Sequence, residues 1–168
     1  MIESQTIISA LQELPGNRLL KSEELYDMLT LTVDAESVHG TVQFLKEASG
    51  LEFSFLTDLC GVHYPENPLP FCVVYHLHNM QEQTRIRIKA WLPGEPQIDT
   101  ISDLFSAANW MERETYDFYG IVFRGHPNLI RILNVEYLDY FPMRKEYPLE
   151  DPTREDKDNR FFGREATK

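Results

Sequence analysis

Residues 84 to 92 place the strongest constraint on the fold, because apolar and polar side chains alternate strictly along them. The apolar set is Ile86, Ile88, Ala90 and Leu92, and it alternates with three cations, Arg85, Arg87 and Lys89, and with Trp91. Successive side chains of a β-strand point to opposite faces, so this pattern predicts a strand with one buried face. An apolar run at 71–79 precedes it, and residues 80–83 between them suit a hairpin. The chain must therefore build a sheet with a hydrophobic face.

The remaining periodic segments predict further strands and helices around this hairpin. Strands are predicted at 29–33 and 51–59, and a helix is predicted at 2–14 before Pro15 and Gly16. A second helix is predicted at 35–49, with Asp34 as its N-cap and Gly50 as its stop. A third helical stretch is predicted to begin at Thr100 or Ser102, with a break between Asn109 and Gly120.

This order of elements predicts an α+β fold, with a mixed, largely antiparallel sheet of about four strands and helices packed on it. Residues 1–120 would form this α/β body. After Gly120 no period is sustained, and prolines at 127, 142, 148 and 152 interrupt any helix or central strand. Residues 121–168 are therefore predicted to be an extended C-terminal docking tail. Its first half is too apolar for a disordered segment, so it must be buried against something. We expect 121–148 to stay unfolded in the isolated chain.

Composition limits the classes of partner and compartment. The 168-residue chain has a formal net charge of −11, which disfavours nucleic acid as a partner. Its apolar runs fall well short of the roughly 20 residues that cross a bilayer. The first five residues lack the basic and apolar regions of a secretory signal, and the chain holds two cysteines, so we expect a reducing compartment.

The sequence predicts neither an active site nor a cofactor site in this chain. An iron–sulfur cluster needs about four thiolates, whereas Cys60 and Cys72 are the only cysteines and fall in predicted strands, where a thiol acts as a small hydrophobe. The glycines form no phosphate-binding pattern, and no serine occupies a nucleophile elbow.

Three histidines carry the alternative hypothesis of a metal site. His76 and His78 point to one face of a predicted strand, and His63 on the preceding strand could approach them. The competing interpretation is a polar sheet face, on which these rings meet solvent or Asp58. Glu52 and Asp58 could pair there with the basic residues of 85–89.

The segment from Glu112 to Pro148 carries a resemblance. A helix places Arg113 and Asp117 on one face, which alone would indicate an ordinary charged surface with one ion pair. The continuation is more specific. It reads Glu112-Arg113-Glu114, Asp117, Gly120, Phe123, His126-Pro127-Asn128-Leu129, Arg131-Ile132-Leu133 and Pro142-Met143-Arg144-Lys145-Glu146-Tyr147-Pro148. This resembles the signature of the C-subunit family of respiratory complex I, the NADH–quinone oxidoreductase, also called the 30-kilodalton subunit. It departs from the family pattern at Ile130, Tyr140-Phe141 and Glu146.

The resemblance implies a cofactor-free structural subunit of the peripheral arm, docked on the D subunit, with the B and I subunits as further neighbours. The assembled complex would use FMN, iron–sulfur clusters, NADH and quinone. Membrane association would be indirect, at the cytoplasmic face of a bacterial inner membrane or the matrix side of the mitochondrial one. The alternative is a related scaffold subunit of a membrane-bound energy-converting hydrogenase. The predicted subunit interface is Glu112, Arg113, Glu114, Asp117, Phe123, His126, Pro127, Arg131, Pro142, Arg144, Lys145 and Pro148.

Overall fold

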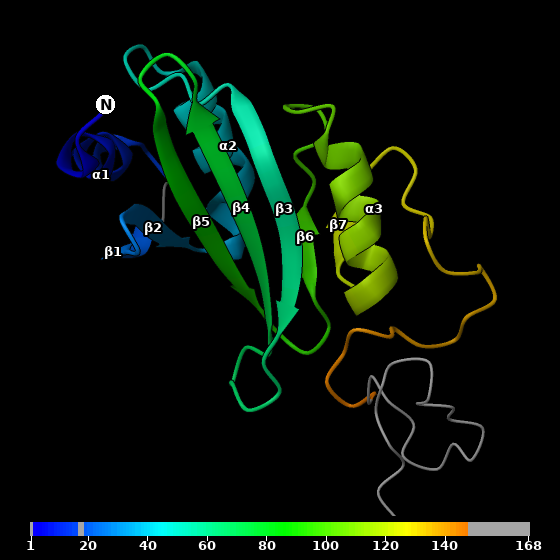
Figure 1. Cartoon of the computed structure of the whole chain (residues 1–168). Coiled ribbons are helices and arrows are strands. Elements are labelled where there is room, and N and C mark those ends of the chain that lie inside the picture. The colour runs from blue at the N-terminus through cyan, green and yellow to red at the C-terminus, as the bar shows by residue number, and fades with distance from the viewer. Residues whose placement is uncertain (1, 17–18, 148–168) are drawn as a thin grey trace, which may run out of the picture.

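The computed structural model describes residues 2–16 and 19–147, and its framework is a mixed sheet. Five strands of this described part form the sheet in the order β1-β2-β5-β4-β3 (Figure 1). They are β1 (Leu19–Leu25), β2 (Met28–Val33), β3 (Phe55–His63), β4 (Phe71–Asn79) and β5 (Thr84–Leu92). β2 pairs with β5 in parallel, and the other neighbours in this sheet are antiparallel. The predicted α+β class is confirmed.

The helices lie behind the sheet and along its β3 edge. The elements are α1 (Ser4–Glu13), the 3₁₀ turn η1 (Ala35–Ser37), α2 (Val38–Glu47) and α3 (Ala108–Tyr119). α2 lies behind the strands in Figure 1, while α3 packs beside β3. A second, two-stranded parallel sheet joins β6 (Gln97–Asp99) to β7 (Val122–Arg124). In the described ranges, no helix has the length and apolar character needed to cross a bilayer.

The core is built on the sheet face that the alternation at 84–92 predicted. Ile86, Ile88, Ala90 and Leu92 are all fully buried, and they pack with Leu11 of α1 and with α2. Burial of apolar surface at about 25 cal/mol per Å² makes this layer the main source of stability. The opposite face of β5 carries charged side chains, and Figure 1 shows no helix lying over that face of β3, β4 and β5.

Two of the predicted strands have the predicted bounds, 71–79 and 84–92, and a third begins one residue earlier than predicted, at Met28. The strand predicted at 51–59 is displaced to 55–63. Leu51 and Phe53 are buried, but they lie in the turn after α2, where Phe53 N–H donates to the Leu45 carbonyl. Because Leu51 and Phe53 alternate with the polar residues Glu52 and Ser54, this turn has the sequence pattern of a β-strand. β1 was missed because its edge position leaves a polar run with little apolar alternation.

The predicted helices are confirmed with changed boundaries. Asp34 does cap the second helical segment, accepting a hydrogen bond from Glu36 N–H at 3.0 Å. The third helix was predicted wrongly in two respects, because α3 begins at Ala108 and runs unbroken to Tyr119. Thr100 and Ser102 lie in the preceding turn and bond to each other rather than cap α3.

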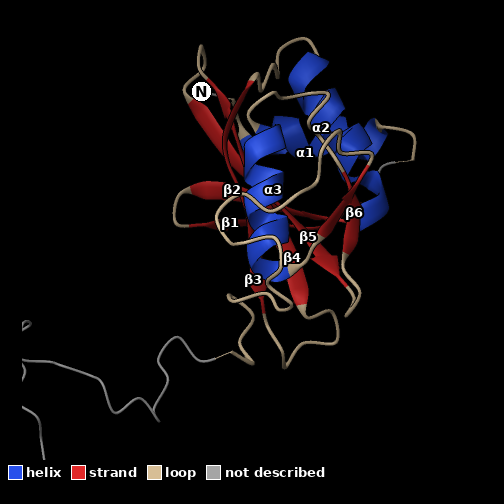
Figure 2. Ribbon diagram, turned by 90° about the vertical axis from the view of Figure 1, so that its right-hand side faces the viewer, coloured by secondary structure: helices blue, strands red, loops and turns tan. Residues whose placement is uncertain are grey.

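The chain after Gly120 is not wholly irregular. Val122–Arg124 forms β7, which pairs with β6 and was not predicted. Residues 125–147 contain neither helix nor strand, and Figure 2 shows this stretch running over α3 and on below it. The rest of the predicted tail, residues 148–168 with the interface residue Pro148, lies outside the described residues.

Close contact between β3 and α3 depends on Gly61. A Cβ atom at this position would lie 2.8 Å from Tyr119 Cδ2 and 2.9 Å from Thr115 Cγ2. Both neighbours are themselves packed against the body, so they have little room to move. The absent side chain therefore lets α3 approach the sheet edge.

Gly61→Ala should lower the free energy of unfolding by about 1–3 kcal/mol, because the added methyl overpacks the β3–α3 contact. Urea denaturation of the purified chain measures this. Gly94→Ala is the matched control, since a Cβ there meets nothing within 4 Å. Equal stability of the two variants would contradict the proposed packing.

Candidate functional site

The predicted interface begins at Glu112, within α3. The chain reverses just after this helix, at Gly120. Its φ of +73° is the left-handed conformation that suits glycine, and its N–H donates to the Tyr116 carbonyl. A Cβ here would also meet Phe141 at 2.5 Å and Arg144 at 2.7 Å. Gly120 thus both ends the helix and lets residues 141–144 fold back over that end.

Asp117 on α3 holds the loop that follows. Its Oδ2 accepts from the backbone N–H groups of Ile132, Leu133 and Asn134 at 3.1, 2.8 and 2.9 Å. Its Oδ1 accepts from Arg131 Nη1 at 2.7 Å and from Asn134 Nδ2 at 3.1 Å. A fully buried carboxylate is thereby given a complete set of donors.

These donors lower the pKa of Asp117 far below its usual range. Burial alone would raise that pKa, but the N–H groups of Asn134 and Leu133, the Arg131 guanidinium and the Ile132 N–H outweigh it. Since the folded-state pKa is below the unfolded one, this stabilisation is present above about pH 4 and is lost only in strongly acidic solution.

Arg131 closes the loop from the other side. Besides its bond to the Asp117 carboxylate, Nη1 donates to the Asp117 carbonyl at 2.9 Å. Nη2 donates to the carbonyls of Leu138 and Tyr140 at 2.8 and 2.9 Å. One guanidinium therefore joins α3 to both ends of the 131–140 loop. Charge-assisted bonds of this forked kind are strong and geometrically specific.

Arg113 and Arg144 complete the attachment of the segment to α3. Arg113 donates from Nε to the Ile130 carbonyl and from Nη2 to the Arg131 carbonyl, both at 3.1 Å. The side-by-side pairing of Arg113 with Asp117 expected on a bare helix is thus replaced by contacts from each to the loop. Arg144 Nε donates to the Tyr119 carbonyl at 2.8 Å. We call Arg113, Asp117, Arg131 and Arg144 the anchor residues.

Aromatic rings pack on two of the anchor guanidinium groups. The Arg144 guanidinium carbon lies 5.0 Å from the Phe71 ring centroid and 4.8 Å from that of Phe141. Arg131 lies 4.9 Å from the same Phe141 ring. These cation–π contacts attach residues 141–144 to both α3 and the end of β4.

Lys145 is bonded through its backbone rather than its side chain. Its N–H donates to His63 Nδ1 at 3.0 Å, and the His63 ring stacks on Phe71 with centroids 4.6 Å apart. The Lys145 side chain is exposed. His63 therefore holds the backbone at Lys145, and its own ring is held by stacking on Phe71.

Glu112 was predicted on a charged helix surface, but it is fully buried. Its Oε1 accepts from Ile101 N–H at 2.8 Å, and its Oε2 is hydrogen-bonded to Thr100 Oγ1. Burial raises its pKa to about 7, and the bonds from Thr100 and Ile101 offset only part of that effect. The carboxyl joins α3 to the turn before it.

His126 and Phe123 also make contacts within the chain rather than with solvent. His126 Nε2 donates to the Asn109 carbonyl at 3.0 Å and its Nδ1 accepts from Asn128 N–H, which places the ring proton on Nε2. Phe123 is only 2% exposed and pairs across the small sheet with Ile98. Of the other predicted interface residues, Glu114, Pro127 and Lys145 are exposed, and Pro142 is half-buried.

The three histidines of the metal hypothesis are not brought together. His63 pairs with Phe71 at one end of β4, roughly 17 Å along the strand from His76. His76 instead accepts from Arg87 Nε at 2.9 Å and lies 3.6 Å from Asp58, as the polar-face interpretation predicted. Within residues 2–16 and 19–147, no group of three or more His, Cys, Asp or Glu side chains could hold a metal ion.

The cysteines behave as small hydrophobic residues, as predicted. Cys72 is buried and Cys60 is half-buried. Burial raises the pKa of the Cys60 thiol to about 11, with Asp58 adding to the shift, and raises that of Cys72 to about 12. Both thiols are therefore protonated at neutral pH, which is the unreactive form.

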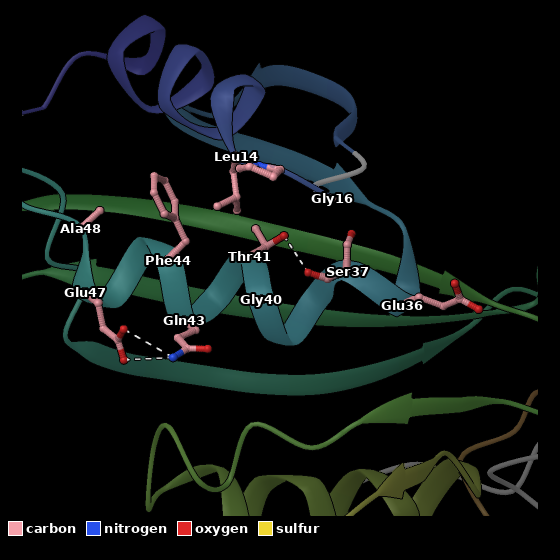
Figure 3. Close-up of a pocket in the computed structure, with 11 residues that line it drawn as sticks. Leu14, Gly16, Glu36, Ser37, Gly40, Thr41, Gln43, Phe44, Glu47 and Ala48 are labelled. Atoms are coloured by element: carbon pink, nitrogen blue, oxygen red, sulfur yellow. Dashed lines mark hydrogen bonds between the residues drawn. The ribbon is translucent and has the colours of Figure 1, made fainter.

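A hollow of about 550 Å³ lies between the end of α1 and α2. Figure 3 shows its polar side chains bonded along α2 itself. Thr41 Oγ1 donates to the Ser37 carbonyl at 2.7 Å, and Gln43 Nε2 lies 3.4 Å from both Glu47 carboxylate oxygens. This arrangement provides no converging set of catalytic groups.

Comparison with known proteins identifies the family of this chain. The profile of the respiratory-chain NADH dehydrogenase 30 kDa subunit family matches residues 31–153, which include α3, the anchor residues and the loop they hold. The chain belongs to this family. The predicted membership is confirmed, and family members are subunits of a multisubunit respiratory oxidoreductase.

Individual relatives extend the match along the chain. The C subunit of NADH-quinone oxidoreductase from Citrifermentans bemidjiense is 39% identical over 156 residues, covering 92% of this chain and 96% of that protein. The C 2 subunit of NADH-quinone oxidoreductase from Rhizobium meliloti is 45% identical over 125 residues, covering 74% of this chain and 68% of that protein.

Two solved structures share the fold of this family member. A trypsin-resistant fragment of Nqo5, residues 1–134, has a TM-score of 0.60 and 29% identity, covering 74% of this chain and 97% of the fragment. A chain of the membrane-bound sulfane sulfur reductase, an archaeal respiratory membrane complex, has a TM-score of 0.70 at 22% identity, covering 86% and 85%. The second likeness shows the fold alone.

Asp117→Asn should release the 131–140 loop while the sheet stays folded, because the amide donates where the carboxylate accepted. Hydrogen exchange would show faster exchange at Ile132, Leu133 and Asn134. Glu114→Gln, one turn away and exposed, is the control and should change nothing there. The hydrogen bonds of Asp117 and Arg131 favour a folded loop in the isolated chain. Fast exchange of these amides in the unchanged chain would instead support the expectation that 121–148 is unfolded before assembly.

Glu112 should make the chain less stable as the pH rises from about 4.5 to about 7. Its folded-state pKa is raised, so the folded state binds more protons than the unfolded state in this window, and unfolding becomes easier as they leave. Glu112→Gln should remove this decline, on the order of a few kcal/mol. Urea denaturation at a series of pH values checks it, and parallel profiles for the two proteins would contradict it.

Proposed function

We propose that this chain is a cofactor-free structural subunit of the peripheral arm of NADH–quinone oxidoreductase. It docks on the D subunit near the quinone-reducing end, with the B and I subunits nearby. The observation that carries the proposal is the two-sided character of residues 130–147. The anchor residues hold the inner side of this segment, whereas its outer side exposes apolar groups.

The outer side of the segment has the composition of a protein interface. Tyr137 is 87% exposed, Leu133 64% and Val135 48%. Other exposed large apolar side chains in the segment and on α3 are Ile130, Tyr140, Met143, Tyr147 and Trp110. We call this set the apolar docking face. Exposed apolar patches with aromatic residues and a polar rim mark interaction sites, and isolated monomers rarely maintain them.

The anchor residues support this face rather than form it. The proposed charge-assisted bonds of Arg113, Arg131 and Arg144 have partners in the same chain, so these side chains set the shape of the docking face. Lys145 is different, because its side chain is exposed while its backbone is held by His63. Lys145 is therefore the cation of the segment best placed to meet a carboxylate of the partner.

The redox chemistry is assigned to the partners. FMN, iron–sulfur clusters, NADH and quinone would be bound by other subunits of the complex. In support, the whole chain has only two cysteines, fewer than the roughly four thiolates of a cluster, and both thiols have raised pKa values. Attachment to the membrane would be indirect, at the cytoplasmic face in a bacterium or the matrix side in a mitochondrion.

The hydrogenase alternative has weaker support. The match to a chain of the archaeal sulfane sulfur reductase complex, at 22% identity, concerns the fold alone and gives no argument for a hydrogenase. The alternative would require a neighbouring large subunit with nickel-binding cysteines, and the identity of the co-purified large subunit decides it.

Leu133→Glu should block assembly without unfolding the chain, because it places a charge on the apolar docking face at a side chain that is 64% exposed. The readout is the yield of intact complex and its quinone reductase activity in membranes. Leu20→Glu is the matched control, since Leu20 is 65% exposed on β1, away from this face. Normal assembly of the Leu133 variant would count against docking through this face.

Arg131→Ala and Arg144→Ala should also lower the amount of assembled complex, but by a different route. Removal of Arg131 leaves the Leu138 and Tyr140 carbonyls without their donor and frees the loop that displays the docking face. Each variant should therefore show faster hydrogen exchange in 131–144 as well as weaker assembly. Full assembly with normal quinone reductase activity would contradict the role of the anchor residues.

A further inference from the structure

The sheet face opposite the core forms a second surface whose charge differs from that of the rest of the molecule. Arg85, Arg87 and Lys89 stand on the non-core side of β5, spaced at every second residue. The chain as a whole carries a net charge of −11. Three cations in one row of about 13 Å are therefore a local exception to a strongly acidic molecule. We call this the basic sheet face.

In the described part of the chain, no helix lies over the basic sheet face, on which Arg85 is exposed and Arg87 and Lys89 are half-buried. α2 lies on the other side of the strands and α3 lies beside β3, so in Figure 1 no helix stands in front of β3, β4 and β5. The face lies on another side of the sheet from α3 and the apolar docking face (Figure 2). It is thus independent of the surface proposed above.

The cations of this face are poorly neutralised by their neighbours. Among the described residues, neither Arg85 nor Lys89 has an ion-pair partner. Arg87 uses Nε to bond His76, a bond that leaves its two terminal nitrogens for another acceptor. The adjacent carboxylate, Asp58, lies 3.6 Å from His76 instead. Burial and the Arg87 charge lower the pKa of His76, so His76 acts as a neutral support for the guanidinium.

The residue types favour a protein partner over a polyanion. Trp91 continues the row on β5 and contacts Tyr64 with ring centroids 5.4 Å apart, while Phe55 on β3 is 51% exposed. Arginine and aromatic residues together are typical of protein interfaces. Three cations are few for nucleic acid or an anionic bilayer, which the −11 chain would also repel at long range.

We propose that the basic sheet face is a second docking surface of this subunit, occupied in the assembled complex by a carboxylate-rich segment of another protein subunit. The carboxylates would accept from Arg85, Arg87 and Lys89, and an apolar side chain of the same segment would pack on Trp91. This rests on the proposal that the chain assembles into a complex, but it concerns a different face.

Lysine labelling of the free chain and of the assembled, detergent-solubilised complex tests the occupancy of this face. An amine-acetylating reagent should modify Lys89 in the free chain and several-fold less in the complex. Gln43→Lys supplies the reference lysine, because Gln43 is exposed on α2, on the covered side of the sheet. Equal labelling of Lys89 in the two states would overturn the proposal.

Zero-length carbodiimide cross-linking identifies the occupant. In the complex, mass spectrometry should find Lys89 joined to an Asp or Glu of another subunit, and Lys89→Arg, which keeps the charge, should abolish that product. Protection of Lys89 without a carboxylate cross-link would overturn the acidic partner. Equal protection of the free chain by phosphatidylglycerol vesicles would assign the face to a membrane and overturn it too. Failure of the chain to co-purify with any complex would instead refute assembly itself.

Discussion

The organisation of residues 113–147 depends on one buried carboxylate. Asp117 lies on the last turn of α3 and gathers three consecutive backbone N–H groups and one guanidinium from a loop that has no helix or strand. A segment without regular structure must satisfy its backbone groups in some other way. This segment is therefore held by α3. The free energy of folding comes mainly from the sheet, which buries one face under α1 and α2. The surfaces available to partners are consequently those that stability does not use.

Periodicity in the sequence was sufficient to predict the strands and helices that have one buried and one exposed face. The hairpin of β4 and β5 and the N-cap at Asp34 could be read from alternation and capping alone. β1 could not be predicted in this way, because an edge strand of polar residues has no periodic apolar positions. The segment after β7 could not either, because its conformation rests on contacts between residues such as Asp117 and Asn134 that no local pattern relates.

The candidate site was located from the order of residues in a family motif, whereas the contacts that each residue makes could not be predicted. The motif located Arg113, Asp117, Arg131 and Arg144, but charge alone suggested contacts with another protein, whereas their partners lie within the chain. Glu112 was placed on the surface because a helical wheel cannot tell which side of α3 meets the turn at Thr100. One available signal was Gly120, since a glycine ending a helix indicates that the chain turns back.

The closure of the 131–140 loop by Arg131 has a consequence for how binding energy is used. A flexible peptide that becomes ordered on a partner loses conformational entropy, about 1–2 kcal/mol for each residue fixed. A loop already fixed by its own chain meets that entropic penalty during folding, before any partner arrives. Such a loop can dock quickly and with shape selectivity, and its contact residues can vary over evolution while the internal scaffold keeps their geometry.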